Sequence, residues 1–319
     1  MEDTQEPRPV LILVGPTAAG KSRLALRIAR ELKTEIISAD SRQVYRGMDI
    51  GTAKPRAEER ARIPHHLIDV VDPDERFDAG MFRDRAVRAI EDLHRRDRIP
   101  LVVGGTGLYV RVLTEGLCDA PKADPVLRLQ LLREEEDHGE GTLYGKLSGV
   151  DADSARRIHP KDRIRILRAL EVYLLSGKTL SSWHREMGEK GAGYRLTWIG
   201  LTMDRAALYR KIDDRVEEMV AAGLEGEVRE LLRRGYDERF PSMLGLGYRQ
   251  WLGYFQGAYG REEAIRLLKR DTRRYAKRQM TWFRREERIR WIQIPPGGDI
   301  ESLADASIGA LSQTERSVL

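Results

Sequence analysis

Apolar residues in the first third of the chain occur in two patterns, as unbroken runs and as repeats every three or four positions. An unbroken apolar run at 10–15 predicts a buried strand. Residues 22–33 then place apolar side chains every three or four positions, as an amphipathic helix does, and 81–95 repeats this helical pattern. Further apolar runs predict strands at 35–40, 66–71 and 99–107. Strands separated by helices indicate a doubly wound parallel sheet of the α/β class.

A different pattern begins after residue 118. Residues 119–125 read as a linker, and the segment 125–188 is mostly helical, with breaks at 139–141 and near Pro160. Strand character returns at 194–201, which indicates that the sheet resumes there.

We therefore expect an α/β core formed by residues 1–118 and 194–319, interrupted by a mostly helical insertion domain at 119–193. The remaining sequence predicts helices at 205–222, 224–234 and 261–287, joined by loops, and a loop with one weak helix from Pro295 onward.

A glycine-rich run follows the first predicted strand and precedes the first predicted helix. It fits the pattern G-x-x-x-x-G-K-[ST], in which backbone N–H groups surround phosphate oxygens and a lysine points at them. The helix that follows adds the positive end of its dipole. A simple glycine-rich turn is the alternative, but the strand-loop-helix context favours a phosphate-binding P-loop. Its residues are Gly15, Pro16, Thr17, Ala18, Ala19, Gly20, Lys21 and Ser22.

Ligands of doubly wound sheets bind beyond the carboxyl ends of the strands, so we expect residues 15–22, 40–43 and 104–106 to meet. Asp40 ends a predicted strand there and could hold Mg²⁺ or accept a proton from a nucleophile. A turn or N-cap aspartate is the alternative. The strand in which an ATPase would carry a second acidic residue ends instead at Gly104, which weighs against ATP hydrolysis.

Composition narrows the class of protein. The 319 residues are 41% hydrophobic and 34% charged, which is typical of a globular chain, and no apolar run approaches the length of a membrane span. Cys118 is the only cysteine, which excludes an internal disulfide and a cysteine-rich zinc site. The N-terminal residues carry no signal-peptide core, so we expect a cytoplasmic protein without membrane contact.

Positive charge is distributed unevenly along a chain whose net charge is +5. Residues 269–290 hold ten Lys and Arg against three acidic residues, with aromatic residues between them, and 156–168 form a second basic block. Clustered positive charge suggests a nucleic acid partner, because binding to a phosphate backbone releases counterions. A solvated helix face is the alternative for either block taken alone.

Together these segments resemble the tRNA dimethylallyltransferases, also called tRNA isopentenyltransferases. The matching stretches run in order along almost the whole chain, and the second is long and unusual enough to be specific. They are GPTAAGKS (15–22), SADSRQVYRGMDIGTAKP (38–55), PHHLIDVVDP (64–73), VGGTGLYV (103–110), ARRIHPKDRIRILRALEVYLLSGK (155–178), GLEGEVREL (223–231), GLGYRQ (245–250) and AKRQMTWFR (276–284).

The resemblance implies transfer of a dimethylallyl group from dimethylallyl diphosphate to N6 of the adenosine immediately 3′ of the anticodon. Asp40 matches the family's catalytic base, and Thr17 and Arg215 match residues that contact the diphosphate. Lys21 and the loop amides would stabilise the departing pyrophosphate, and Ser22 would offer its hydroxyl to Mg²⁺. Taken alone, Arg215 would be interpreted as a surface ion-pair arginine.

The resemblance also implies that the acceptor nucleotide is flipped out of the anticodon loop and that the insertion domain grips the anticodon stem. Without the cysteines of a zinc-finger extension, the chain is similar to the shorter bacterial form, and we expect a monomer. The positions that match the family's tRNA contacts are Asp40, Ser41, Arg42, Gln43, Thr106, Arg128, Ile164, Arg165, Ile166, Leu167, Arg168, Gly245, Leu246, Gly247, Tyr248, Arg249 and Gln250.

Three alternatives use the same phosphate loop. A small-molecule or nucleotide kinase would share it but has no evident need for the basic block at 269–290. An RNA-binding protein with a regulatory nucleotide would have no need for Asp40 at a strand end. A relative that prenylates free adenosine phosphates would share the loop and Asp40 but would not need extended basic surfaces.

Overall fold

The computed structural model describes residues 6–187 and 193–295. The chain divides into two compact units, Met1–Thr114 with Gly193–Leu319, and Glu115–Ala192. Sequence prediction placed the insertion at 119–193. The weak helix predicted beyond Pro295 lies outside the described residues, and no helix within them is long and apolar enough to cross a membrane.

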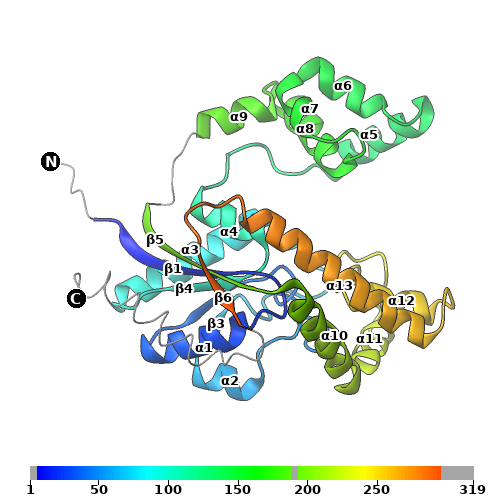
Figure 1. Ribbon diagram of the computed structural model, residues 1–319. Coiled ribbons are helices and arrows are strands. Elements are labelled where there is room, and N and C mark those ends of the chain that lie inside the picture. The colour runs from blue at the N-terminus through cyan, green and yellow to red at the C-terminus, as the bar shows by residue number, and fades with distance from the viewer. Residues whose placement is uncertain (1–5, 188–192, 296–319) are drawn as a thin grey trace. The chain divides into compact units, whose positions relative to one another are not determined.

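The first unit is built on a six-stranded sheet in the order β3-β2-β4-β1-β5-β6, with every neighbouring pair parallel. The α/β parallel sheet predicted from the sequence is therefore confirmed (Figure 1). Its strands are β1 (Arg8–Val14), β2 (Ile36–Ala39), β3 (His65–His66), β4 (Leu101–Gly104), β5 (Tyr194–Met203) and β6 (Arg290–Ile294).

Both faces of this sheet are buried, which explains why its strands read as continuous apolar runs. Along β1, Leu11 and Leu13 pack with α1 (Lys21–Glu31), and Ile12 faces the opposite core beside α3 (Ala79–Arg95). Figure 1 shows α1 and α3 on opposite sides of the sheet. The helix face predicted for 22–33 is confirmed, since its side chains at 24, 25, 28 and 29 are buried.

A group of helices continues the first unit beyond the carboxyl ends of the strands. The helices α10 and α11 flank Gly223, whose positive φ of 97° lets the chain turn between them. A separate core joins these helices to the loop after β2. The helices are α10 (Arg205–Ala221), α11 (Leu224–Arg233), α12 (Tyr248–Phe255) and α13 (Arg261–Phe283).

The structure corrects several sequence-based predictions. The strand predicted at 66–71 is wrong beyond His66, because Leu67 and Asp69 adopt positive φ values of 64° and 55° that no strand allows. The sequence did not reveal the helices α2 (Ala57–Arg62), α4 (Gly107–Thr114) and α12, or strand β6. The basic helix ends at Phe283 rather than at 287.

The second unit contains five helices among its described residues. Its core is a cluster of leucine, isoleucine and alanine side chains from four of them, including Leu131, Leu147 and Leu170. The helices are α5 (Pro125–His138), α6 (Thr142–Val150), α7 (Ala152–Arg157), α8 (Arg163–Ser176) and α9 (Leu180–Met187). Asp124, Asp151 and Asp162 cap the first turns of α5, α7 and α8.

Candidate active site

A cavity of about 1110 Å³ lies in the first unit at the carboxyl ends of the strands. The three predicted strand exits all contribute to its lining, with residues from 17–22, from 40–43 and from 104–105. Side chains of α10 and α13 and the loop before α12 complete it. The expectation that these strand ends meet is confirmed, and the cavity is large enough for two substrates of modest size.

The glycine-rich loop has the positive φ values at Gly15 and Gly20 that its sequence pattern leads us to expect. Gly15 has a φ of 141°, and a Cβ there would lie 2.6 Å from the carbonyl oxygen of Leu201. Gly20 has a φ of 89°, and no side chain of the described residues caps the first turn of α1. The N-terminus of α1 is therefore directed at the cavity without a protein cap, as in an anion-binding loop.

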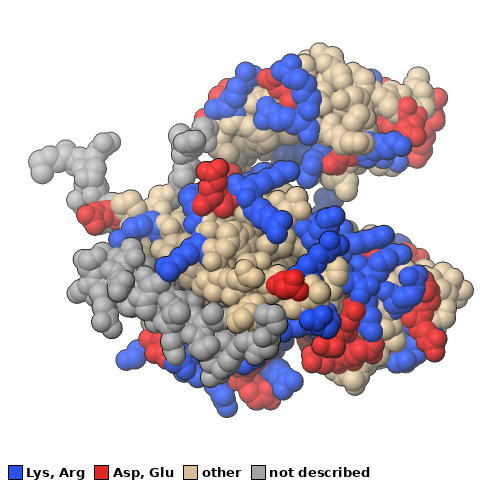
Figure 2. All heavy atoms as spheres, in the orientation of Figure 1, with Lys and Arg blue, Asp and Glu red and all other residues tan. Residues whose placement is uncertain are grey.

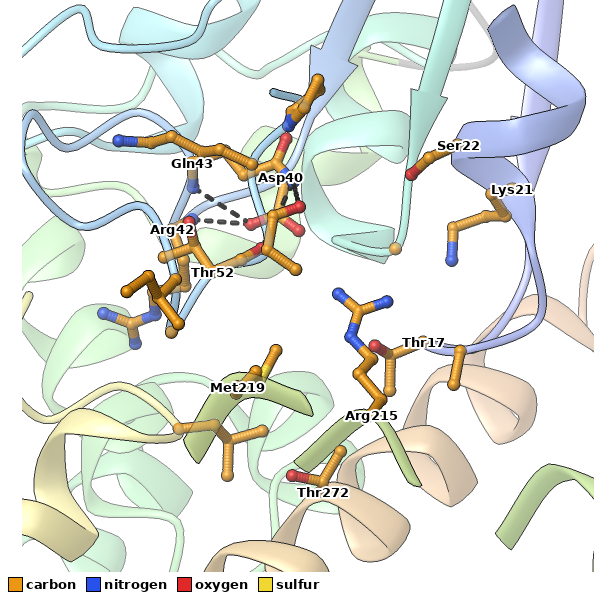
Figure 3. A pocket seen from close by; sticks show the side chains of 18 of the residues that line it. Thr17, Lys21, Ser22, Asp40, Arg42, Gln43, Thr52, Arg215, Met219 and Thr272 are labelled. Carbon is orange, nitrogen blue, oxygen red and sulfur yellow. Dashed lines mark hydrogen bonds between the residues drawn. The ribbon is translucent and has the colours of Figure 1, made fainter. Parts of the chain in front are cut away.

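Lys21, Arg215 and Asp40 lie together among the charged residues that line this cavity, and Nζ of Lys21 donates to the carbonyls of Gly15 (2.9 Å) and Pro16 (2.8 Å). Figure 3 shows Arg215 reaching from α10 into the space between Lys21 and Asp40. Burial and the neighbouring charge of Arg215 lower the pKa of Lys21 to about 7, although Asp40 acts in the opposite direction. Burial likewise lowers the pKa of Arg215, and Asp40 opposes this shift. Concentrated positive charge of this kind is ready to receive a multiply charged anion.

This geometry predicts that pyrophosphate binding weakens as the pH rises above 7. Bound pyrophosphate, a multiply charged anion, raises the pKa of Lys21, so above pH 7 the free protein must take up a proton to bind it. The dissociation constant should rise by up to about tenfold per pH unit between pH 7 and 9. Calorimetric titration with pyrophosphate measures this dissociation constant at each pH. Dividing it by the dissociation constant of Lys21→Met at the same pH cancels the effect of ionisation of the ligand. An equal slope in both proteins would contradict it.

Asp40 has a structural as well as a chemical environment. Its Oδ1 accepts hydrogen bonds from the backbone N–H groups of Arg42 (2.8 Å) and Gln43 (3.3 Å), so the aspartate also shapes the turn after β2. Within the part of the chain that the structure describes, Oδ2 accepts no hydrogen bond. One oxygen therefore fixes the orientation of the carboxylate, and the other can face a substrate.

Gln279 on α13 is a site residue that sequence reasoning missed. Its Oε1 accepts a hydrogen bond from the backbone N–H of Thr17 (2.8 Å), and its Nε2 donates to the carbonyl of Gly105 (3.0 Å). A Cβ on Gly105 would lie 2.0 Å from Nε2, so glycine is needed for this approach. The signal was a polar residue on the apolar stripe of a basic helix, beside Ala276 and Phe283. Gln279 thus ties the phosphate loop to the end of β4.

The candidate tRNA contacts of the first unit have diverse environments. Thr106 accepts a hydrogen bond from the backbone N–H of Ser41 (3.0 Å), which joins two strand exits. Arg42 donates to the carbonyl of Pro241 (2.9 Å) and thereby holds the loop before α12. Gly245, Leu246 and Arg249 line the cavity.

Tyr248 and Gln250 have buried side chains on α12. Tyr248 is fully buried, and its hydroxyl donates to Glu227 (2.7 Å). Gln250 is buried, accepts from the N–H of Gly247 (3.0 Å) and donates to Asp271 (3.0 Å). The side chains of both residues therefore belong to the packing of α12, and their contact with tRNA stays a prediction.

The candidates in the second unit separate into core and surface. Ile166 and Leu167 are buried in the helical core, and their contact with tRNA stays a prediction. Arg128 and Arg168 both bind the carboxylate of Glu171, which is fully buried. Arg168 also donates to the carbonyl of Pro121 (2.7 Å), so this cluster anchors the start of the unit.

Ile164 and Arg165 remain on the surface of the second unit. Ile164 is 80% exposed, and the side chain of Arg165 is 65% exposed while it approaches Asp162 at 3.3 Å. These two residues are the members of the predicted run 164–168 that are available to a partner.

The basic side chains of α13 have two different environments. Arg273 forms an ion pair with Asp213 (2.7 Å), so it belongs to the packing of α13 on α10. Arg274, Lys277 and Arg278 are exposed. Figure 2 shows Lys and Arg side chains gathered on the surface over α13. The predicted basic surface is therefore real, but Arg273 is a packing residue.

Comparisons with known proteins agree with one another. Residues 43–286 match the model of a family described as IPP transferase. The chain is 52% identical over 284 residues to tRNA dimethylallyltransferase 1 of Syntrophotalea carbinolica, which covers 89% of this chain and 90% of the relative. It is 48% identical over 307 residues to tRNA dimethylallyltransferase of Geobacter metallireducens, covering 96% and 98%.

Solved structures show the same similarity. A tRNA delta(2)-isopentenylpyrophosphate transferase from Staphylococcus epidermidis is 37% identical with a TM-score of 0.69, covering 96% of this chain and 99% of that one. A eukaryotic dimethylallyltransferase, described as acting on tRNA, is 29% identical with a TM-score of 0.80, covering 97% and 79%.

Proposed function

The chain belongs to the IPP transferase family, and from that premise we propose that it is a tRNA dimethylallyltransferase. It transfers the dimethylallyl group of dimethylallyl diphosphate to N6 of the adenosine immediately 3′ of the anticodon. The observation that carries this proposal is the grouping of Lys21, Arg215 and Asp40 around one large cavity at the phosphate loop.

The two cations act on the leaving group. When the bond between the allylic carbon and the diphosphate oxygen breaks, negative charge develops on pyrophosphate. Lys21 and Arg215 face this charge from α1 and α10, together with the N–H groups at the start of α1. Thr17, whose hydroxyl lies beside Arg215 in Figure 3, adds a further donor. These interactions strengthen as the bond breaks, which is the condition for lowering the barrier.

Asp40 acts on the nucleophile. The N6 amine of adenine is weakly basic because its lone pair is delocalised into the ring, so attack on the allylic carbon is assisted by removal of a proton. The carboxylate of Asp40 accepts that proton as the N–C bond forms. Its hydrogen bonds from the N–H groups of Arg42 and Gln43 hold it at the carboxyl end of β2.

The site also fits Mg²⁺. Ser22 points into the cavity beside Lys21, and residues 6–187 and 193–295 contain no cluster of three acidic, histidine or cysteine side chains that could form a closed metal cage. Mg²⁺ commonly binds through one or two protein ligands together with phosphate oxygens and water. Ser22 would hold the ion, which would neutralise charge on the diphosphate.

Two surfaces support tRNA as the acceptor. The exposed cations of α13 offer a sequence-independent attraction for the RNA backbone. On the second unit, Ile164 and Arg165 offer an apolar and a charged contact, and we propose that this unit grips the anticodon stem-loop. The acceptor adenosine is flipped out of its stack to reach Asp40.

Incubation of the protein with Mg²⁺, isotope-labelled dimethylallyl diphosphate, unmodified tRNA and free AMP tests the proposal. Label in tRNA is the expected result. Label in AMP alone would indicate the adenylate-prenylating activity, and ATP turnover without transfer of label would indicate a kinase.

Neutralising the exposed cations of α13 is expected to flatten the salt dependence of tRNA binding. The triple variant Arg274→Gln, Lys277→Gln and Arg278→Gln should lower the slope of log K against log salt by roughly two to three. Filter binding at several salt concentrations measures this slope. The double variant Arg88→Gln and Arg95→Gln on α3 is the control and should leave it unchanged. An unaltered slope in the triple variant would mean that this face of α13 does not contact the RNA.

A further inference from the structure

The loop between β2 and α2 forms a wall of the cavity through residues 49–56. Its backbone converges on one carboxylate that lies outside the cavity lining. The N–H groups of Asp49 and Ile50 donate to Oε2 of Glu227 at 2.8 and 2.7 Å, and that of Gly51 donates to Oε1 at 3.0 Å. Three successive amides on one carboxylate form a well-organised anion nest.

Tyr248 completes this anchor from below the loop. Its hydroxyl donates to Oε1 of Glu227 (2.7 Å), and its ring packs directly under Gly51. A Cβ on Gly51 would lie 2.6 to 2.7 Å from atoms of that ring, so the loop can approach only with glycine there. Tyr248 is fully buried, so the loop packs on a well-supported side chain.

The loop is connected to Asp40 through hydrogen bonds of Gln43. The carbonyls of Thr52 and Ala53 accept hydrogen bonds from Nε2 of Gln43, each at 3.3 Å. The N–H of Gln43 in turn donates to Oδ1 of Asp40 (3.3 Å). Figure 3 shows Thr52 and Gln43 beside Asp40, on the side of the cavity away from Lys21. A continuous chain of contacts therefore joins Glu227 to the carboxylate that receives the proton.

We propose that Glu227 is a positioning residue for the acceptor half of the reaction. It fixes the loop 49–53, and through Gln43 it aims Asp40 at the amine of the incoming adenine. The role rests on the proposed function, since it concerns proton acceptance from the tRNA base. The phosphate loop lies on other elements, so the donor half should be independent of Glu227.

Glu227→Gln tests this role with little change in shape. A glutamine offers only one oxygen as an acceptor and would turn its NH₂ group toward backbone donors. We expect kcat with tRNA to fall by about 10- to 100-fold, because displacements of about 1 Å have effects of this size. Affinity for pyrophosphate should stay within about twofold. Backbone amides 49–51 should exchange with solvent at least about fivefold faster.

Glu230→Gln is the matched control. Glu230 lies on the same helix, is half exposed and pairs with Arg233, so its replacement should change none of these quantities. All assays are run below the melting transition of each variant. If Glu227→Gln does not fold, Tyr248→Phe removes one donor to the same carboxylate and should lower kcat by about two- to fivefold without changing pyrophosphate affinity.

Two results would overturn the proposal: a kcat within twofold of the wild-type value in the folded variant, or a parallel loss of pyrophosphate affinity. The second would show that Glu227 supports the whole cavity. Hydrogen exchange keeps the inference separate from the proposed function. If the wild-type protein transfers no label to tRNA, unchanged protection of amides 49–51 in Glu227→Gln would still refute the anchor.

Discussion

Replacement of Asp40 by asparagine is expected to lower kcat by about 10²- to 10⁴-fold, the size of a lost general base. The amide can still accept the hydrogen bonds that Arg42 and Gln43 donate, so the turn after β2 should survive. What it loses is the ability to take the proton from N6. Single-turnover transfer of labelled dimethylallyl to tRNA measures the effect.

Asp40→Ala provides the comparison for this prediction. It removes both the base and the acceptor of the turn, so it should lose thermal stability that the asparagine variant keeps. In both variants the affinity for tRNA should remain within an order of magnitude. If kcat of Asp40→Asn stays near the wild-type value, Asp40 serves the turn alone and the proposed mechanism is wrong.

Lys21→Met is expected to lower kcat by about 10²- to 10³-fold, as removal of one preorganised donor to a developing anion does. The methionine fills the space of the lysine stem, and Arg215, Thr17 and the N–H groups of α1 then face the departing pyrophosphate without the ammonium group. Rates should be measured with saturating dimethylallyl diphosphate, so that weaker binding of the donor does not affect the measured kcat.

Lys33→Met serves as the control, because Lys33 is an exposed residue just after the opposite end of α1. It should leave kcat unchanged. If Lys21→Met raises KM but leaves kcat intact, the lysine binds the diphosphate equally in the ground and transition states. The role in leaving-group stabilisation would then be refuted.

Several predicted tRNA contacts have side chains that bind other parts of the protein. The resemblance placed Tyr248, Gln250, Arg128 and Arg168 at the RNA surface. In the structure, Tyr248 binds Glu227, and the two arginines bind the buried Glu171. Glu171 follows Arg128 by 43 positions in the sequence. A motif carries no information about which way its side chains point, because that depends on packing against distant elements.

Local pattern was sufficient for the central features of this protein. The alternation of apolar runs and helical periods determined the parallel sheet, because burial on both faces demands continuous apolar strands. The spacing of Gly15, Gly20 and Lys21 determined the phosphate loop, because only glycine adopts that backbone without strain. The position of Asp40 at a strand end placed it in the site.

Only the tertiary structure decided what supports these residues. Gln279 reaches Thr17 across 262 positions of sequence, and Glu227 reaches the loop at 49–51 across more than 170. Hydrogen bonds over such separations form only when helices and loops are packed in space, and neither partner shows a local period that marks it. The sequence thus indicated the groups that we propose for the chemistry, and packing decided which groups hold them in place.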